Sequence, residues 1–153
     1  MTRSRQIGIT LMELLTVMVI VGILAAIAIP SYRTYLMRAQ RSDATAALLR
    51  VAAAQEKFYL QNNVYATQAQ IGNAPPAGLG VPVSGGVALT ERGYYQLVLN
   101  SANTALDFTV TATPIAGGPQ VKDTSCATFT INQQGTRGAT NGSSGDTTAS
   151  CWR

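Results

Sequence analysis

The residues that could carry out chemistry are few in this chain, and one carboxylate stands apart from the others. The sequence has no histidine, which removes Ser-His and Cys-His catalysis and the commonest metal ligand. Its seven acidic residues are scattered and form no paired-carboxylate motif, and neither a glycine-rich phosphate loop nor a Cys-x-x-Cys pair occurs. The sequence therefore offers no case for an enzyme, a metal site or a cofactor, and attention falls on Glu13.

Glu13 lies near the start of a long apolar run that extends to Ile29. From Leu14 onward the run contains no charge, and Thr16 is its one polar side chain. Counted from Ile9, the run has about 21 residues and would be about 31 Å long as a helix, enough to cross a bilayer core. A carboxylate inside such a segment costs about 2.5–3.5 kcal/mol on insertion scales. We therefore expect Glu13 to have a function.

The residues before Glu13 resemble the class III signal of the type IV pilin family. That signal is a short basic leader ending in glycine, followed by a hydrophobic residue, Thr, Leu, any residue and Glu. Here the leader contains Arg3 and Arg5, and Ile9 replaces the usual Phe. The matching residues are Gly8, Ile9, Thr10, Leu11, Met12 and Glu13.

The resemblance implies a role for each of these residues. A prepilin peptidase would cut between Gly8 and Ile9, and the new amino terminus on Ile9 would be N-methylated. In the filament, Glu13 would face the charged terminus of a neighbouring subunit, and Thr10 would also serve filament assembly.

Two other kinds of signal compete with this interpretation. An ordinary secretory signal peptide would be cleaved at Ala26-Ile27-Ala28, but the run is long for its apolar region and would enclose Glu13. A plain signal anchor would use Glu13 as a helix N-terminal acid that complements the macrodipole. The spacing from Gly8 to Glu13 favours the pilin-type signal over both.

The apolar run is predicted to continue as an amphipathic helix over residues 31–60. Pro30 should kink or loosen the helix between its two halves, and the resemblance assigns Gly22 and Pro30 to helix flexibility during packing. Most charged residues of this segment, including Arg41 and Asp43, are predicted to lie on faces of the helix other than the apolar one. Apolar side chains recur at helical spacing: Ala44, Ala47, Leu48, Val51, Ala54 and Phe58.

The rest of the chain predicts a small antiparallel sheet. Residues 61–93 are rich in turn signals and predict a loop with, at most, a short helix near residues 66–71. Residues 135–150 are rich in Gly, Ser and Thr and predict a flexible linker, although Cys151 would tie its far end back to Cys126. Strands are predicted at residues 94–99, 107–113 and 127–131. This α+β arrangement, a long N-terminal helix packed on the sheet with a closed C-terminal loop, resembles the type IV pilin fold, most closely that of PilE-type minor pilins.

Cys126 and Cys151 are the chain's two cysteines. In an exported chain a lone pair predicts a disulfide, which needs an oxidising compartment, and the alternative is a pair of buried free thiols. The disulfide would place residues 31–153 on the periplasmic or outer side. Charge does not settle the orientation, since basic residues lie on both sides of the run.

The predicted organisation has three parts: a leader (residues 1–8), a transmembrane or filament-core helix (9–30) and a periplasmic globular domain (31–153). The resemblance implies a structural subunit of a type IV pilus, for pilus biogenesis and twitching motility or adhesion. It would wait in the inner membrane as a single-pass protein and then join an extracellular pilus. Its partners would be other pilin subunits, the prepilin peptidase and the inner-membrane assembly machinery.

Two alternative functions remain open. One is a pseudopilin of a type II secretion system, which shares the signal; related major pseudopilins often carry a calcium site and lack this disulfide. The other is a pilin that acts as a DNA-binding or surface-binding module, through a basic rim of Lys122, Arg137 and Arg153. The formal charge of +4 includes the two arginines of the leader, so little positive charge is left and DNA binding is the weaker expectation.

Overall fold

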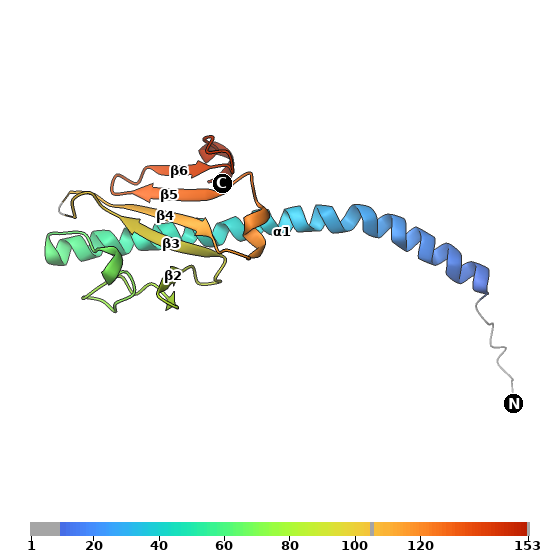
Figure 1. The fold of residues 1–153 in the computed structure, drawn as a ribbon, viewed down its shortest axis with the longest axis horizontal. Helices are drawn as coiled ribbons and strands as arrows, with labels where there is room; N and C mark the ends of the chain where they lie inside the picture. Colours follow the sequence, from blue (N-terminus) through green and yellow to red (C-terminus); the bar gives the residue numbers. More distant parts are fainter. Residues whose placement is uncertain (1–9, 105, 153) are drawn as a thin grey trace, which may run out of the picture. The chain divides into compact units, whose positions relative to one another are not determined.

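The computed structural model describes residues 10–104 and 106–152 (Figure 1). The chain divides into two compact units, Met1–Leu36 and Met37–Arg153. The described residues of the first unit belong almost entirely to helix α1 (Leu11–Asn62), whose remaining turns belong to the second unit.

Helix α1 begins where its own side chains favour a start. Oγ1 of Thr10 accepts a hydrogen bond from the backbone amide of Glu13 at 3.2 Å, the N-cap contact of a Thr-x-x-Glu sequence. Helix α1 continues through Pro30, and the hydroxyl of Thr34 donates to the Pro30 carbonyl at 3.1 Å. Pro30 therefore lies inside one continuous helix and does not end it.

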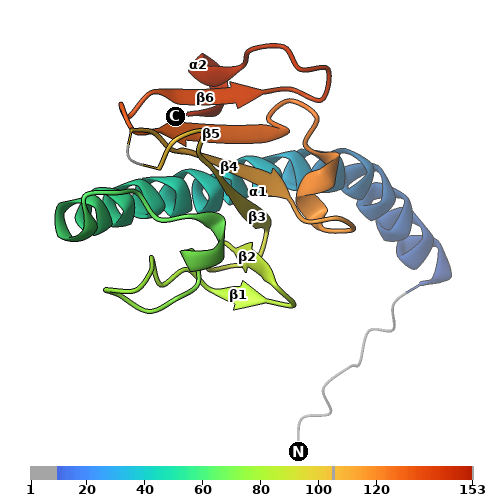
Figure 2. The same ribbon diagram turned by 60° about the vertical axis from the view of Figure 1, so that its left-hand side comes forward.

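Within the second unit, α1 buries one face against a sheet (Figure 2). The buried apolar residues follow the predicted spacing: Ala44, Ala47, Leu48, Val51 and Phe58. The prediction that Asp43 marks another face is wrong, because Asp43 is also buried. Gln55 is buried on this helix too, where its side-chain amide donates to the Ala66 carbonyl at 3.0 Å and accepts from the Ala66 amide at 2.8 Å. That pair of bonds fixes the chain after α1 to the helix.

The sheet is an antiparallel meander in which each strand pairs with the next along the chain, in the order β1-β2-β3-β4-β5-β6. The strands are β1 (Val83–Ser84), β2 (Val87–Leu89), β3 (Tyr95–Asn100), β4 (Thr109–Pro114), β5 (Thr128–Asn132) and β6 (Arg137–Thr140). One register row crosses five of the strands and is buried in each; its members are Ala88, Leu97, Ala112, Phe129 and Ala139. Because side chains alternate between the faces of a strand, this row identifies the face that packs on α1.

The sheet is larger than the sequence predicts. Strands β3, β4 and β5 confirm the three predicted strands within one or two residues at each end. The prediction that residues 61–93 form only loop and a short helix is incomplete, since β1 and β2 lie there beside the 3₁₀ helix η1 (Gln68–Gln70).

The prediction of a flexible linker over residues 135–150 is wrong. Strand β6 pairs with β5 there, and the short helix α2 (Thr148–Cys151) follows it. Ala139 is buried, and its amide donates a hydrogen bond to the Thr148 hydroxyl at 2.8 Å. Its carbonyl accepts one from the Thr147 amide at 2.9 Å. A low-complexity segment is thus ordered by its pairing with β5, and nothing in the segment's own sequence indicates that pairing.

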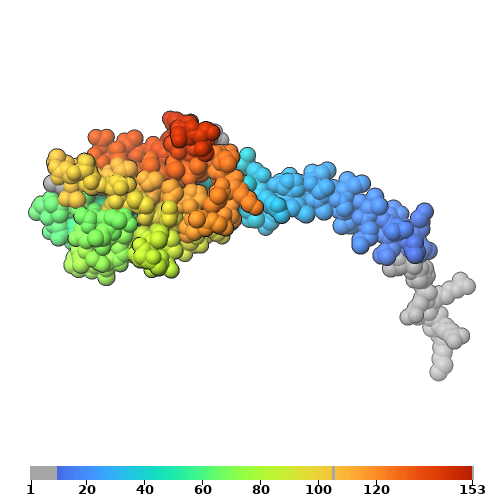
Figure 3. Space-filling view, viewed as in Figure 1, coloured from blue at the N-terminus to red at the C-terminus, as the bar shows by residue number. Residues whose placement is uncertain are grey.

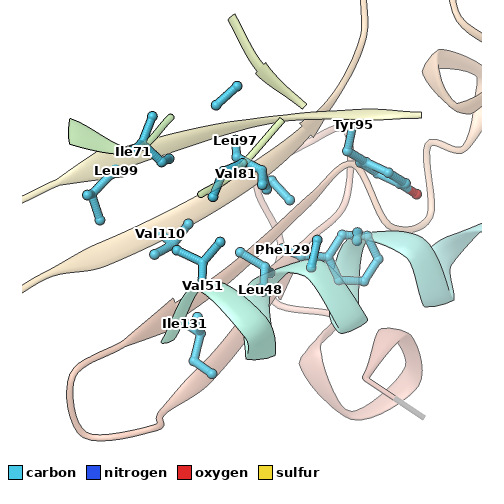
Figure 4. Close-up of a cluster of buried hydrophobic side chains, with 14 of the residues drawn as sticks. Leu48, Val51, Ile71, Val81, Tyr95, Leu97, Leu99, Val110, Phe129 and Ile131 are labelled. Atoms are coloured by element: carbon cyan, nitrogen blue, oxygen red, sulfur yellow. The ribbon is translucent and has the colours of Figure 1, made fainter. Parts of the chain in front are cut away.

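The core forms where α1 meets the middle of the sheet. Figure 4 shows Leu48 and Val51 of α1 facing side chains of β3, β4 and β5, including Val110 and Phe129. A second contact comes from the connection between β4 and β5, which contains the 3₁₀ helix η2 (Pro119–Lys122). Figure 3 shows this orange segment beside the cyan part of α1.

Candidate functional site

The predicted cleavage and methylation site, Gly8 and Ile9, lies outside the described residues, as do Arg3 and Arg5 of the leader. Thr10 and the rest of the signal that follows it are described.

Glu13 occupies the first turn of α1 with its carboxylate exposed. Within the part of the chain that the structure describes, this carboxylate makes no hydrogen bond and no ion pair. Thr10 is committed to capping the helix, so it has a local role besides the predicted one. The macrodipole compensates a first-turn acid by only about 0.3–1 kcal/mol. The Glu13 carboxylate is therefore available to a cationic group of another molecule.

The apolar run of α1 is exposed along its length. The most apolar stretch of 18 residues in α1 has no buried residue, and the length and composition of the helix suit a membrane span. An exposed apolar surface of this size is normally covered, either by lipid or by another protein. Gly22 lies in this run, and apart from its chain neighbours and the adjacent backbone of the helix no described atom lies within 4 Å of the position a Cβ would take there. Space in the single chain therefore does not require glycine at this position.

An ion pair that the sequence did not indicate ties α1 to the β4–β5 connection. Nε and Nη2 of Arg41 donate to the two carboxylate oxygens of Asp123 at 2.6 and 2.8 Å. The side chains are 16% and 4% exposed, so the pair is largely removed from water. No local pattern links these two residues, which are 82 positions apart.

Further buried polar groups surround this ion pair. The side-chain amide of Gln120 donates to the Met37 carbonyl at 3.1 Å and to Oε1 of Gln40 at 2.7 Å. Burial raises the pKa of Tyr95 well above its ordinary range, and the nearby Asp123 charge raises it further. Tyr95 is therefore a neutral phenol at physiological pH. Together these contacts hold the part of α1 from Met37 to Arg41 against the β4–β5 connection within the second unit, which we call the globular unit.

Cys126 and Cys151 form the predicted disulfide, with their Cα atoms 5.9 Å apart. The alternative of free thiols is thus excluded. Beside it, Nε1 of Trp152 donates to the Gly138 carbonyl at 2.8 Å, and the Arg137 guanidinium lies 5.2 Å from the centroid of the Trp152 ring. The disulfide, the indole and β6 therefore close the C-terminal loop together.

Reduction of the disulfide is expected to lower the free energy of unfolding by about 3–4 kcal/mol in the chain-entropy model, and the melting temperature by about 10 °C or more. The intact full chain should show no free thiol before reduction. Strand β6 should stay protected from protease even after reduction, because its pairing with β5 does not depend on the disulfide. Circular dichroism and limited proteolysis with and without reductant test both expectations. An unchanged melting temperature would contradict the first.

The three residues of the predicted basic rim lie on different elements, and one of them is not described. Lys122 ends η2, Arg137 stacks on Trp152, and Arg153 lies outside the described part of the chain. Across residues 10–104 and 106–152, no group of three or more His, Cys, Asp or Glu side chains is placed to hold a metal ion.

Comparison with known families yields two matches. The family described as "Type IV minor pilin ComP, DNA uptake sequence receptor" matches residues 30–130, and the "Prokaryotic N-terminal methylation motif" matches residues 3–29. Together the two matches cover the apolar run and most of the globular unit.

Three individual proteins illustrate the extent of the similarity. The fimbrial protein EcpC of Eikenella corrodens is 33% identical over 126 residues, which is 80% of this chain and 74% of EcpC. The type IV major pilin protein PilE1 of Neisseria gonorrhoeae is 42% identical over 72 residues, or 47% of this chain, and the matched part spans only 34% of PilE1. A solved type IV pilin from Shewanella oneidensis is 23% identical, with a TM-score of 0.44 over 66% of this chain and 89% of that one.

Proposed function

The chain belongs to the type IV minor pilin family, and on this premise we propose that it is a structural subunit of a type IV pilus that assembles through its N-terminal helix. Before assembly it is a membrane-anchored precursor, held by the apolar run of α1. Its partners in the filament are other pilin subunits. We propose no catalytic role for the chain.

The observation that carries this proposal is the carboxylate of Glu13, which pairs with none of the residues that the structure describes and lies in an exposed apolar helix. In a filament the apolar runs of several subunits cover one another, and the surroundings of Glu13 become dry. A carboxylate there needs a cation, because an unpaired buried charge is strongly unfavourable. The ammonium on Ile9 of a neighbouring subunit would supply it.

The remaining steps are also part of the proposal. A prepilin peptidase cleaves after Gly8, and inner-membrane machinery then extracts and assembles the subunit. Gly22 and Pro30 let α1 unwind during packing, since glycine has low helix propensity and proline lacks an amide hydrogen. The globular unit faces the periplasm, and the Cys126–Cys151 disulfide supports that orientation because disulfides persist in oxidising compartments.

Processing gives the first test of this route. The mature chain is expected to begin at Ile9 and to carry about 14 Da of added mass on that residue for one methyl group. Intact and N-terminal mass spectrometry of membrane-extracted protein measures both. Gly8→Val should block cleavage and leave membrane insertion intact. A mature start at Ile29 would mean signal-peptide cleavage and would overturn the proposed processing.

DNA binding is a second candidate function, because the matching family is that of a DNA uptake sequence receptor. On the described surface, Arg137 lies over the ring of Trp152 and Lys122 ends η2, and both side chains are exposed. A gel-shift titration of the full chain with duplex DNA at several salt concentrations tests this function. Binding to phosphates must weaken steeply with salt, and no retardation at low salt would remove the candidate. The pseudopilin alternative is disfavoured by the pilin relatives and by the disulfide.

A further inference from the structure

The loop that follows β6 contains the one Asn-Gly dipeptide of the chain, Asn141-Gly142. In such a dipeptide the side-chain amide of asparagine lies close to the next backbone nitrogen, and glycine has no side chain that hinders their approach. Asparagine is one of the thermolabile residues of proteins. The contacts of this dipeptide in the folded loop therefore decide whether it reacts.

The backbone nitrogen of Gly142 is bonded elsewhere in the folded chain. Its N–H donates to the Thr124 carbonyl at 2.8 Å. Thr124 precedes β5 and Gly142 follows β6, so this bond lies just beyond the last pairing of the two strands, where the Ala127 amide donates to the Thr140 carbonyl at 2.7 Å. An amide nitrogen attacks a carbonyl carbon only after it has lost its hydrogen. The bond to Thr124 must therefore open before Gly142 can react.

The side-chain amide of Asn141 is held in place as well. Its Oδ1 accepts hydrogen bonds from the Ser143 amide at 3.0 Å and from the Gly145 amide at 2.8 Å. Both partners are donors, which identifies the accepting atom as the oxygen of the side-chain amide. The amide of Asn141 in turn donates to the Gly145 carbonyl at 2.9 Å. The orientation of Cγ of Asn141 is therefore fixed while these bonds last.

Water has access to the dipeptide. An open pocket of about 530 Å³ is lined by Asn141, Gly142 and Ser143 and by Thr124 and Ser125 of the facing segment. Gly142 and Ser143 are exposed. Solvent can therefore remove the proton of the Gly142 amide and hydrolyse a product, and the hydrogen bonds of the loop are what oppose the reaction.

We propose that Asn141 is a deamidation site that the folded loop protects and that reacts when the loop opens. In the open loop the deprotonated nitrogen of Gly142 attacks Cγ of Asn141. The new C–N bond closes a five-membered succinimide, and Nδ2 leaves as ammonia after it takes up a proton from solvent. Water then opens the ring at one of its two carbonyl groups, which gives aspartate or isoaspartate. The reaction consumes one water and releases one ammonia, and it needs no oxidant or cofactor.

The test is the rate at which the peptide that contains Asn141 gains the mass of deamidation, followed by mass spectrometry of the digested full chain. One sample is incubated folded, in a maltoside detergent with its disulfide intact, and a second is incubated reduced and unfolded in guanidinium chloride at the same mildly alkaline pH. We expect Asn141 to react about a hundredfold faster in the unfolded chain, because three hydrogen bonds of the folded loop must open together. Equal rates in the two samples would overturn the proposed protection.

Asn132 is the matched control within the same molecule. Its Oδ1 also accepts from the backbone amides two and four positions later, those of Gln134 and Thr136, at 3.1 and 2.9 Å. The amide of Gln133, which follows it, is likewise bonded to a backbone carbonyl. In the unfolded chain Asn132 should react much more slowly than Asn141, because the side chain of Gln133 hinders the attack. Equal rates for the two asparagines in the unfolded chain would overturn Asn141 as a distinct site.

Gly142→Ala tests the chemistry of the dipeptide in a chain that still folds. The added Cβ would lie 3.6 Å from Cβ of Thr124, an ordinary van der Waals contact, and Gly142 is not among the glycines with positive φ. The variant should therefore keep the wild-type melting temperature. In the unfolded chain it should slow the deamidation of Asn141 several-fold, and an unchanged rate would contradict attack by the nitrogen of residue 142.

Hydrogen exchange of the Gly142 amide in the folded wild type gives an independent measure of the same opening. Exchange requires the bond to Thr124 to break, so it should be slowed by a factor similar to that for deamidation. Rapid exchange of this amide together with slow deamidation of Asn141 would overturn the bond to Thr124 as the cause of the protection.

Discussion

Glu13→Val is expected to leave the precursor cleaved and inserted in the membrane, and to exclude it from filaments. In the bilayer the substitution removes a carboxylate from an apolar segment, which favours insertion. In a filament it removes the partner of a neighbouring ammonium and leaves that charge buried and unpaired. Breaking such a pair typically costs about 3–5 kcal/mol, which reduces incorporation by at least about a hundredfold.

The measurement is the amount of variant in sheared pili relative to the membrane pool, compared with wild type. Glu13→Gln should fail in the same way, because it keeps the size of the side chain and removes the charge. Thr16→Val is the matched control: it removes a polar group three residues later, where the hydroxyl only donates to the Met12 carbonyl. It should be incorporated normally. Equal incorporation of Glu13→Val and wild type would show that Glu13 does not select filament partners.

Arg41→Met is expected to destabilise the globular unit more than any other single charge removal on α1. The substitution leaves Asp123 buried at 4% exposure without its cation. The free energy of unfolding should fall by about 3–5 kcal/mol, and the melting temperature by about 10–20 °C. Thermal unfolding of the full chain with its disulfide intact, followed by circular dichroism, measures both.

Arg50→Met is the matched control for this ion pair, since Arg50 pairs with Glu91 and both side chains are mostly exposed, at 60% and 63%. Surface pairs of this kind contribute about 0–1 kcal/mol, so the melting temperature should change by a few degrees at most. Replacing both buried partners, as in Arg41→Met combined with Asp123→Leu, should recover much of the loss because no buried charge is left unpaired. An Arg41→Met variant as stable as Arg50→Met would contradict the role assigned to the pair.

The long helix and the three central strands are largely predictable from the sequence. The apolar residues of α1 recur at helical spacing, and Thr10 and Glu13 form a capping sequence at its start. Each of these two signals depends only on residues that lie a few positions apart in the chain. The strands β3, β4 and β5 have alternating apolar residues between turn signals, which is again a local pattern.

The ordered C-terminal segment was not predictable in this way. Strand β6 has the sequence Arg137-Gly138-Ala139-Thr140, which lacks the apolar alternation of a typical strand. It is a strand because β5 offers an unpaired edge and because the indole of Trp152 donates a hydrogen bond to the carbonyl of Gly138 within it. Neither cause is visible in the segment itself.

The sequence by itself determined that this protein has an N-terminal signal and an apolar helix, a carboxylate placed inside that helix, and a pair of cysteines suited to a disulfide. Each of these depends on residue type and short spacing, which act before the chain folds. Only the tertiary structure decided that Asp43 is buried, that Arg41 binds Asp123, and that the amide of Gly142 donates to the carbonyl of Thr124. Burial and ion pairing depend on which distant segments come together, and the packing of α1 on the sheet brings together residues that lie more than eighty positions apart in the chain.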